Sequence, residues 1–253
     1  MTDGLARIIA AGSFPSGFHV AWLPETESTQ DVARAAARGG ASERSVWVAD
    51  YQFAGRGRQG RVWLAPPGSS LMLSMLFRLE RRMAQAHRCT MLVSTALCRA
   101  VLDVAPNLEP RVKWPNDVML GRRKLAGVLA EAAWEGDQAT VIVGVGVNVH
   151  AVDPAMADRA VALDEPAGRS VDRGLLLARL LARIDELDGC GPDHLVQAWQ
   201  ALLWGRDQPV RLRLADGTPD RTAVVLGALP DGRLRVRLDD GTELVTATAE
   251  LLP

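Results

Sequence analysis

Six short apolar runs, each bounded by glycine, proline or charged residues, dominate the first 150 residues of the chain. They lie at residues 17–23, 45–51, 71–79, 112–119, 125–133 and 139–149. Runs of this length, several of them alternating apolar and polar side chains, are typical of β-strands. Gly136 and Asp137 stand between the last two runs and are typical of a tight hairpin. The first constraint on the fold is therefore a β-sheet.

Helical patterns interrupt the strands. Residues 29–38 are rich in alanine and follow Ser28, whose side chain suits a helix N-cap. Residues 84–104 have apolar side chains at helical spacing, and two more helical stretches follow at residues 172–187 and 193–203. These patterns predict an α+β fold, a mixed β-sheet with flanking helices.

From about residue 206 onward the chain alternates apolar and polar residues. Asp-Gly pairs, which are typical of tight hairpin turns, stand at residues 216–217, 231–232 and 240–241. Closely spaced turns of this kind predict a small β-barrel of about five short strands. We therefore divide the chain into a main domain, residues 1–205, and a small β-domain, residues 206–253.

Charge and composition limit what the chain can bind. Its 29 basic and 30 acidic residues leave a net charge of −1, so no overall basic field attracts nucleic acid or an anionic membrane. The apolar runs are shorter than the ~20 residues of a membrane-spanning helix, and the first residues lack the pattern of a signal peptide. The 3 cysteines and 4 histidines have no metal-ligand spacing. We expect a cytoplasmic protein.

A segment rich in glycine and arginine, residues 55–61, directly follows a predicted strand. Its three glycines let the backbone approach a ligand, and its three arginines offer paired donors for phosphate or carboxylate. The segment lacks the Gly-Lys-Ser or Gly-Lys-Thr ending of a phosphate loop, and it does not open a helix as a dinucleotide-binding turn does. Taken alone, it fits an anion-binding loop and a solvated or RNA-binding loop about equally well.

The chain has two lysines, Lys113 and Lys124, and both lie in one short stretch. A lysine ammonium is a compact point charge, unlike the planar arginine guanidinium. Lys113 opens a Lys-Trp-Pro-Asn-Asp segment, residues 113–117, whose amide and carboxylate suit a divalent metal or a ribose. The plainer alternative is a hairpin with a charged turn.

Alternating glycines, Gly144 and Gly146, mark the last predicted strand of the main domain. A strand without side chains on one face leaves room for a flat ligand, and a glycine bulge in a buried strand explains the pattern equally well. Asn148, near the end of this strand, has an amide that can both donate to and accept from an adenine edge.

In their order and spacing, these segments resemble the biotin–protein ligase family. The resemblance covers about residues 24–149. It rests on Ser28-Thr29-Gln30, on Gln52 with residues 55–61 and Trp63, and on residues 113–117, 123–127 and 144–148. It implies the biotin–lipoate ligase catalytic domain, which is similar to that of class II aminoacyl-tRNA synthetases, followed by a small SH3-like C-terminal barrel.

The resemblance implies an ATP-dependent, AMP-forming ligase. Such an enzyme joins biotin to ATP, releases pyrophosphate and forms biotinyl-5′-AMP. It then transfers biotin to one lysine of the biotin carboxyl carrier protein or domain of acetyl-CoA carboxylase or a related carboxylase. Biotin, ATP and Mg²⁺ are the expected small molecules. Because 27 residues precede Ser28, too few for the winged-helix domain of bifunctional members, we expect a monofunctional monomer or homodimer that binds neither DNA nor membrane.

The resemblance also assigns roles to residues. The expected catalytic residues are Lys124, in the main role, with Arg58, Lys113 and Asp117. The expected biotin-binding residues are Ser28, Thr29, Gln52, Gly55, Arg56, Arg58, Trp63, Lys124 and Gly127. The expected nucleotide-binding residues are Arg58, Arg61, Asn116, Lys124 and Asn148. Asp117 is also the candidate ligand for Mg²⁺ or the base for the acceptor lysine.

Several positions depart from the family pattern. Phe53 stands where threonine is usual, Gln30 stands where asparagine is common, and no basic residue follows Arg237 to reach the nucleotide from the small domain. A lipoate–protein ligase or octanoyltransferase of the same fold is the nearest alternative, and the long arginine–glycine loop favours biotin over both. A non-catalytic RNA-binding module is the alternative from another class, which the near-zero net charge opposes.

Overall fold

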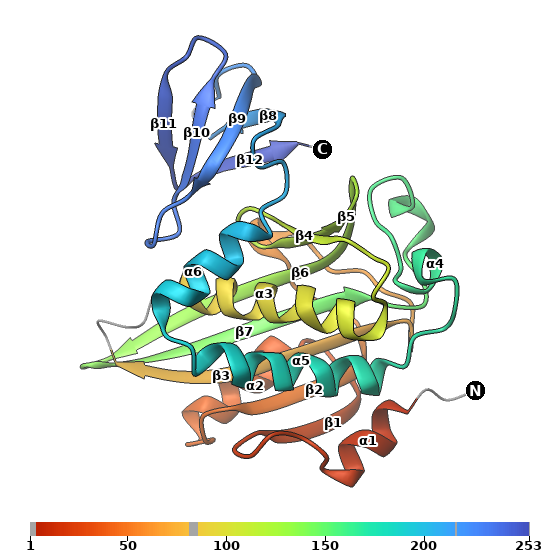
Figure 1. Cartoon of the computed structure of the whole chain (residues 1–253). Helices are drawn as coiled ribbons and strands as arrows, with labels where there is room; N and C mark the ends of the chain where they lie inside the picture. The colour runs from red at the N-terminus through yellow and green to blue at the C-terminus, as the bar shows by residue number, and fades with distance from the viewer. Residues whose placement is uncertain (1–3, 81–85, 216, 253) are drawn as a thin grey trace.

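The computed structural model describes residues 4–80, 86–215 and 217–252, which form two β-sheets with flanking helices (Figure 1). The large sheet has seven strands in the order β1-β2-β3-β7-β6-β5-β4. They are β1 (His19–Thr26), β2 (Ser45–Gln52), β3 (Ser70–Glu80), β4 (Pro110–Lys113), β5 (Asp117–Leu120), β6 (Arg123–Glu135) and β7 (Gln138–Asn148). The predicted α+β class with a mixed sheet is confirmed.

The parallel pair in this sheet positions a helix terminus beside the site. β1 and β2 run parallel, and the other described pairs are antiparallel. A parallel pair needs a crossover, which α2 (Thr29–Arg38) supplies. Ser28 caps α2, as predicted, because its side chain accepts a hydrogen bond from the backbone N–H of Gln30. The crossover places the N-terminus of α2 just after the end of β1.

The run expected as one strand at residues 112–119 is two strands, so that expectation was wrong. β4 ends at Lys113, β5 begins at Asp117, and the two pair antiparallel. The chain reverses around Pro115, which has no N–H to donate to a sheet ladder. The hairpin places Lys113 directly opposite Asp117.

Helices cover both faces of the large sheet. α2 packs on one face, against Leu76 and Ile142. α3 (Ala86–Val104) and α5 (Arg173–Asp188) pack together over the other face (Figure 1). The remaining helices are α1 (Leu5–Ala11), α4 (Asp164–Ala167) and α6 (Pro192–Ala201). None of the described helices is long and apolar enough to cross a membrane.

Most of the predicted helices are confirmed. α2 has the expected bounds, and α5 and α6 differ by one or two residues from the stretches expected at 172–187 and 193–203. The helix expected at 84–104 is α3, although residues 84 and 85 lie outside the described residues. α1 was not expected, because its 7 residues are too few to establish a helical period.

The small sheet consists of the five predicted strands, β8 (Pro209–Leu214), β9 (Arg221–Ala228), β10 (Leu234–Leu238), β11 (Glu243–Thr246) and β12 (Ala249–Leu252). They pair antiparallel in the order β11-β10-β9-β8-β12. Gly232 and Gly241 have φ of 84° and 85°, as expected for Asp-Gly turns. The third expected turn includes Asp216, outside the described residues. The division of the chain after residue 205 falls between α6 and β8 and stays a prediction.

A turn of the small sheet contacts the main domain. The indole N–H of Trp114 donates to the carbonyl oxygen of Gly232 at 2.8 Å, and Trp114 is 3% exposed. His87, at the start of α3, lies against the same glycine and is within 3.1 Å of the Pro230 carbonyl oxygen. Burial lowers the pKa of His87. These contacts hold the small sheet beside the β4–β5 hairpin.

Candidate active site

A cavity of about 1010 Å³ lies between one end of the large sheet, the glycine–arginine loop (residues 55–61) and the small sheet. Its size suits a small organic ligand with a nucleotide. Of the predicted site residues, those that line it are Ser28, Thr29, Gln52, Arg56, Arg58, Arg61, Trp63, Lys113, Asn116, Asp117, Lys124, Gly127 and Asn148. Segments far apart in the sequence therefore meet in one cavity, as the resemblance implies.

Gly55 is the predicted site residue that does not line the cavity. A Cβ at this position would lie 2.7 Å from the carbonyl oxygen of Trp63, while the Trp63 N–H donates to the Gly55 carbonyl oxygen at 2.9 Å. The glycine is needed for this close approach of two backbone segments. In this structure it shapes the base of the loop rather than facing the cavity.

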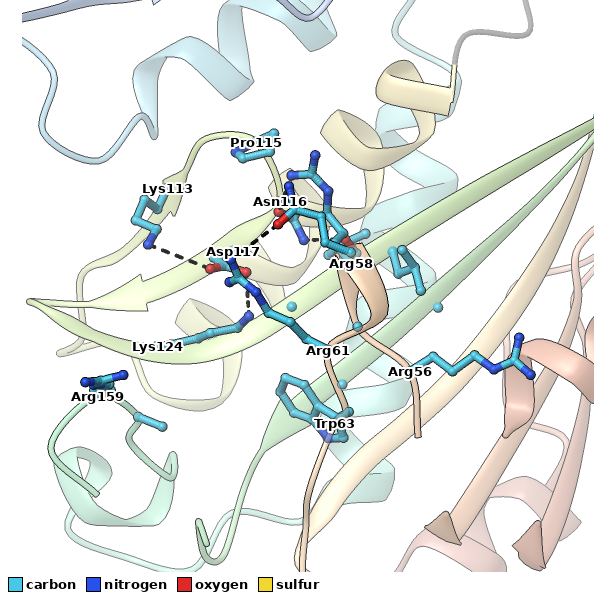
Figure 2. A pocket seen from close by; sticks show the side chains of 18 of the residues that line it. Arg56, Arg58, Arg61, Trp63, Lys113, Pro115, Asn116, Asp117, Lys124 and Arg159 are labelled. Carbon is cyan, nitrogen blue, oxygen red and sulfur yellow. Dashed lines mark hydrogen bonds and ion pairs between the residues drawn. The ribbon is translucent and has the colours of Figure 1, made fainter. Parts of the chain in front are cut away.

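The two lysines converge on one carboxylate (Figure 2). Lys124 Nζ lies 2.6 Å from Asp117 Oδ1, and Lys113 Nζ lies 3.9 Å from Asp117 Oδ2. Burial lowers the pKa of Lys113, and the charge of Asp117 opposes that effect. The hairpin and β6 thus position two compact cations around one acidic group at the cavity wall.

The surroundings of Asp117 bear on its expected role as a Mg²⁺ ligand. Both carboxylate oxygens of Asp117 face ammonium groups. The part of the chain that the structure describes contains no cluster of three or more histidine, cysteine, aspartate or glutamate side chains able to hold a metal ion. Mg²⁺ requires several oxygen ligands. The protein groups present here therefore do not fit a Mg²⁺ ion held by the protein alone.

Each arginine of the glycine–arginine loop is paired with a different element. Arg56 lies 2.6 Å from Asp31 of α2, Arg58 donates to Asn116 Oδ1 at 3.1 Å, and Arg61 lies 3.6 Å from Glu250 of β12. Burial lowers the pKa of Arg58. In Figure 2, Arg58 and Arg61 extend toward the Asn116–Asp117 region, whereas Arg56 extends away from it. The loop is held to the helix, the hairpin and the small sheet together.

The side chains of Trp63 and Gln30 lie close to the glycine face of β7, where Gly144 and Gly146 also line the cavity. A Cβ on Gly146 would lie 2.5 Å from the Trp63 ring, and a Cβ on Gly144 would lie 2.8 Å from Gln30 Oε1. Lys124 Nζ lies 5.7 Å from the centroid of the Trp63 ring. The Trp63 indole nitrogen is buried and has no hydrogen-bond partner among the described residues. The glycines make room for these side chains, which the sequence pattern did not indicate.

Five polar residues line the cavity around the N-terminus of α2, and we call them the polar floor: Ser28, Thr29, Gln30, Gln52 and Ser74. Gln30 Nε2 donates to Glu131 at 3.0 Å and to the Ile142 carbonyl at 3.3 Å, so Gln30 Oε1 turns to Ser74 and accepts its hydroxyl hydrogen at 2.8 Å. Thr29 Oγ1 lies 2.8 Å from Ser74 Oγ. Because the Ser74 hydrogen is already used, the one hydroxyl hydrogen of Thr29 goes to Ser74 Oγ or to Gln52 Oε1, which lies 3.1 Å away, and a lone pair of Thr29 Oγ1 stays available as an acceptor.

Two further floor residues offer hydrogens. Gln52 Oε1 accepts from the backbone N–H of Thr29 at 2.6 Å, which leaves the Gln52 amide nitrogen as a donor. Ser28 Oγ accepts from the Gln30 N–H at the helix cap, which leaves the Ser28 hydroxyl hydrogen available. The floor therefore combines two donors and one acceptor, a set that matches a group carrying both C=O and N–H.

The two amides expected at the nucleotide also have structural partners. Asn116 Nδ2 donates to the Val128 carbonyl at 2.9 Å, and Asn148 Nδ2 is 3.4 Å from the Lys124 carbonyl. Asn148 is 5% exposed. Both side chains thus tie the β4–β5 hairpin and β7 to β6, besides lining the cavity.

Some lining residues were missed by sequence reasoning. Ser74 is a polar residue inside an otherwise apolar strand, a signal that was available, and Arg159 comes from an irregular segment without a motif. The family pattern implied a basic residue of the small domain beyond Arg237, and the sequence has none there. The structure instead brings Arg211 and Arg213 of β8 to the cavity.

Comparisons with known proteins agree with this geometry. The model of the biotin/lipoate A/B protein ligase family matches residues 22–148. A biotin--[acetyl-CoA-carboxylase] ligase of Mycobacterium tuberculosis is 33% identical over 96% of this chain and 91% of its own length. A solved biotin protein ligase from Aquifex aeolicus in complex with biotin and ATP is 26% identical, with a TM-score of 0.77 over 92% of this chain and 98% of that one.

A bifunctional ligase/repressor of Salmonella typhimurium is 35% identical over 67% of this chain, and the match spans only 55% of that longer protein. The chain belongs to the biotin/lipoate A/B protein ligase family. Within this family, a relative that matches over nearly its full length is named a biotin--[acetyl-CoA-carboxylase] ligase, as the resemblance in sequence implies.

Proposed function

We propose that this protein is an ATP-dependent biotin–protein ligase. It forms biotinyl-5′-AMP from biotin and ATP and transfers the biotinyl group to a lysine of a biotin carboxyl carrier domain. The observation that carries the proposal is the single cavity in which the polar floor, the Trp63 ring and the Lys124–Asp117 pair lie together. The near-full-length match to a biotin ligase supports biotin over the lipoate and octanoate alternatives.

The polar floor suits the ureido ring of biotin. This ring is uncharged, and it has a carbonyl acceptor and N–H donors. The hydrogens of Ser28 and Gln52 and the lone pair of Thr29 complement these groups. Neither lipoate nor octanoate has such a ring, so the floor would leave its buried polar groups unpaired with those acids.

Lys124 supports the first step electrostatically. A carboxylate oxygen of biotin attacks the α-phosphorus of ATP, and pyrophosphate leaves. The nucleophile belongs to the substrate, so the enzyme has to align two anionic groups and balance their charge. The Lys124 ammonium, held by Asp117 and lying over the Trp63 ring, supplies that charge at the cavity wall.

The remaining predicted residues keep their assigned roles as parts of the proposal. Arg58 and Arg61 face the phosphates, and Asn116 and Asn148 bind the nucleoside. Gly127 allows a close backbone approach to biotin. The backbone of Arg56 contacts biotin, since its side chain is paired elsewhere.

In the second step the acceptor amine attacks the acyl carbon and AMP leaves. Asp117, which has Lys113 beside it, takes the amine proton in this proposal. No step is assigned to Mg²⁺.

The test is pyrophosphate release with biotin and ATP, followed by biotin transfer to a purified carrier domain. We expect pyrophosphate release with biotin but not with lipoate or octanoate. Lys124→Met should slow adenylate formation by about 10²–10³-fold, since it removes a transition-state charge partner. Arg123→Met, which removes a neighbouring cation paired outside the cavity with Glu165, should stay within about threefold of wild type. Wild-type rates in the Lys124 variant would remove its catalytic assignment.

A further inference from the structure

Asp31 is an acidic residue that connects α2, the helix that begins with floor residues, to the glycine–arginine loop. It lies in the first turn of α2, the helix that begins with the floor residues Thr29 and Gln30. One carboxylate oxygen pairs with Arg34 on the same helix, and the other lies 2.6 Å from Arg56 of the glycine–arginine loop. Asp31 itself does not line the cavity.

The carboxylate of Asp31 is held by interactions within its own helix, independently of the loop. An acidic residue in the first turn of a helix interacts favourably with the helix dipole. Arg34, three residues on, holds one oxygen of Asp31 and is itself held by Glu131 at 2.6 Å. An exposed ion pair is usually weak because two flexible side chains must be ordered. Here one of the two partners is already ordered, so the Asp31–Arg56 pair loses less entropy.

The loop depends on contacts of this kind. Gln59 has a φ of 57°, in the left-handed region that non-glycine residues rarely adopt. Residues 58–60 form only a short 3₁₀ turn, and the side chains of Arg58 and Arg61 face the hairpin and small sheet. Arg56 is the loop arginine that pairs with α2, so its pair with Asp31 ties the loop to the helix that begins with floor residues.

We propose that Asp31 is a positioning residue that holds the loop closed through Arg56 and so retains biotinyl-5′-AMP until the acceptor lysine arrives. The inference rests on the proposed function. When the loop opens early, the adenylate leaves the cavity. An unrelated lysine amine then attacks its acyl carbon, a C–N bond forms, AMP departs and the amine loses a proton. Adenylate formation itself does not require the Asp31 carboxylate, because its partners are Arg34 and Arg56 and not the floor side chains or Lys124.

The experiment compares Asp31→Asn with wild type in the presence of biotin, ATP, a carrier domain and a bystander protein such as albumin. We expect the ratio of bystander to carrier biotinylation to rise about three- to tenfold. The first-turnover rate of adenylate formation should stay within about twofold of wild type. Arg34→Gln, which removes the ordering of Asp31 but keeps its pair with Arg56, should raise the ratio less than Asp31→Asn does. Asp31→Glu, which keeps the charge, should restore most of the retention.

Salt and a double variant separate positioning from a general loss of structure. High salt should raise the leak of wild type toward that of Asp31→Asn and change the variant little, since salt screens exposed pairs. Asp31→Asn with Arg56→Gln should leak no more than Arg56→Gln alone. An unchanged ratio in Asp31→Asn, or additive effects in the double variant, would overturn the proposal. A wild type that releases no pyrophosphate would instead overturn the proposed function.

Discussion

At the scale of single residues, the two lysines illustrate what a sequence can indicate and where it stops. Their scarcity and their motifs indicated one site, and both lie at Asp117. The sequence could not indicate that Lys113 is the more buried of the two, with a side chain 12% exposed against 34% for Lys124. Burial depends on the packing of the hairpin against the small sheet, which involves residues more than 100 positions away.

Lys113 should therefore titrate below the ordinary lysine pKa of 10.5, because burial disfavours its charged form. A folded state that binds fewer protons than the unfolded state gains stability as pH rises between the lowered pKa and 10.5. Nitrogen NMR of ¹⁵N-lysine protein gives just two side-chain signals, and Lys113→Arg assigns them. Asp117→Asn should lower the pKa of Lys113 further. Titration of Lys113 at or above 10.5 would contradict this account.

At the scale of elements, period and turn residues predicted every strand of the large sheet except the β4–β5 division. The apolar period of residues 112–119 runs through the turn, and the local signs of the reversal were Pro115 and the charged residues that favoured the hairpin alternative at residues 113–117. The glycines of strand β7 had two explanations in the sequence, room for a flat ligand and a glycine bulge. Gly146 and Gly144 line the cavity, and they also lie against Trp63 and Gln30, which neither explanation included. Contacts between segments so far apart leave no periodic signal in either one.

Gly146→Ala should therefore destabilise the protein by about 1–3 kcal/mol, because the new methyl group would lie 2.5 Å from the Trp63 ring. Trp63→Ala should remove most of that penalty, giving a large coupling in a double-mutant cycle of urea unfolding. Gly39→Ala is the matched control, since its nearest neighbour would lie at an ordinary 3.4 Å. Equal costs of Gly146→Ala with and without Trp63 would show that the ring does not set the requirement for glycine.

At the scale of the whole molecule, the small sheet brings Arg211, Arg213 and Glu250 to the cavity. The sequence predicted its strands and turns, but a basic residue that reaches the nucleotide was expected only after Arg237. The contact between Trp114 and Gly232 is one of those that hold β8 and β12 beside the cavity, and no local pattern reports the docking of one sheet on another. Motif spacing therefore could not predict which strands of the small sheet line the cavity.

The docking of the small sheet depends in part on Trp114. Trp114→Phe keeps an aromatic ring but loses the hydrogen bond to Gly232, which should cost about 1 kcal/mol and loosen the small sheet. Since Arg211 and Arg213 come from that sheet, the KM for ATP should rise about three- to tenfold, consistent with a loss of that free energy in binding. The Kd for biotin should change by less than about twofold, because the floor residues belong to the large sheet and α2.

Trp199→Phe is the control for this variant. It also removes a buried indole hydrogen bond, to Ser94 Oγ at 3.1 Å, but that bond joins α6 to α3 within the main domain. It should cost a similar stability and leave the KM for ATP unchanged. If both variants raise the KM for ATP equally, general loosening of the fold explains the effect. If only Trp114→Phe does, the docked position of the small sheet contributes to nucleotide binding, although β8 and β12 follow every motif by which the sequence resembles the family.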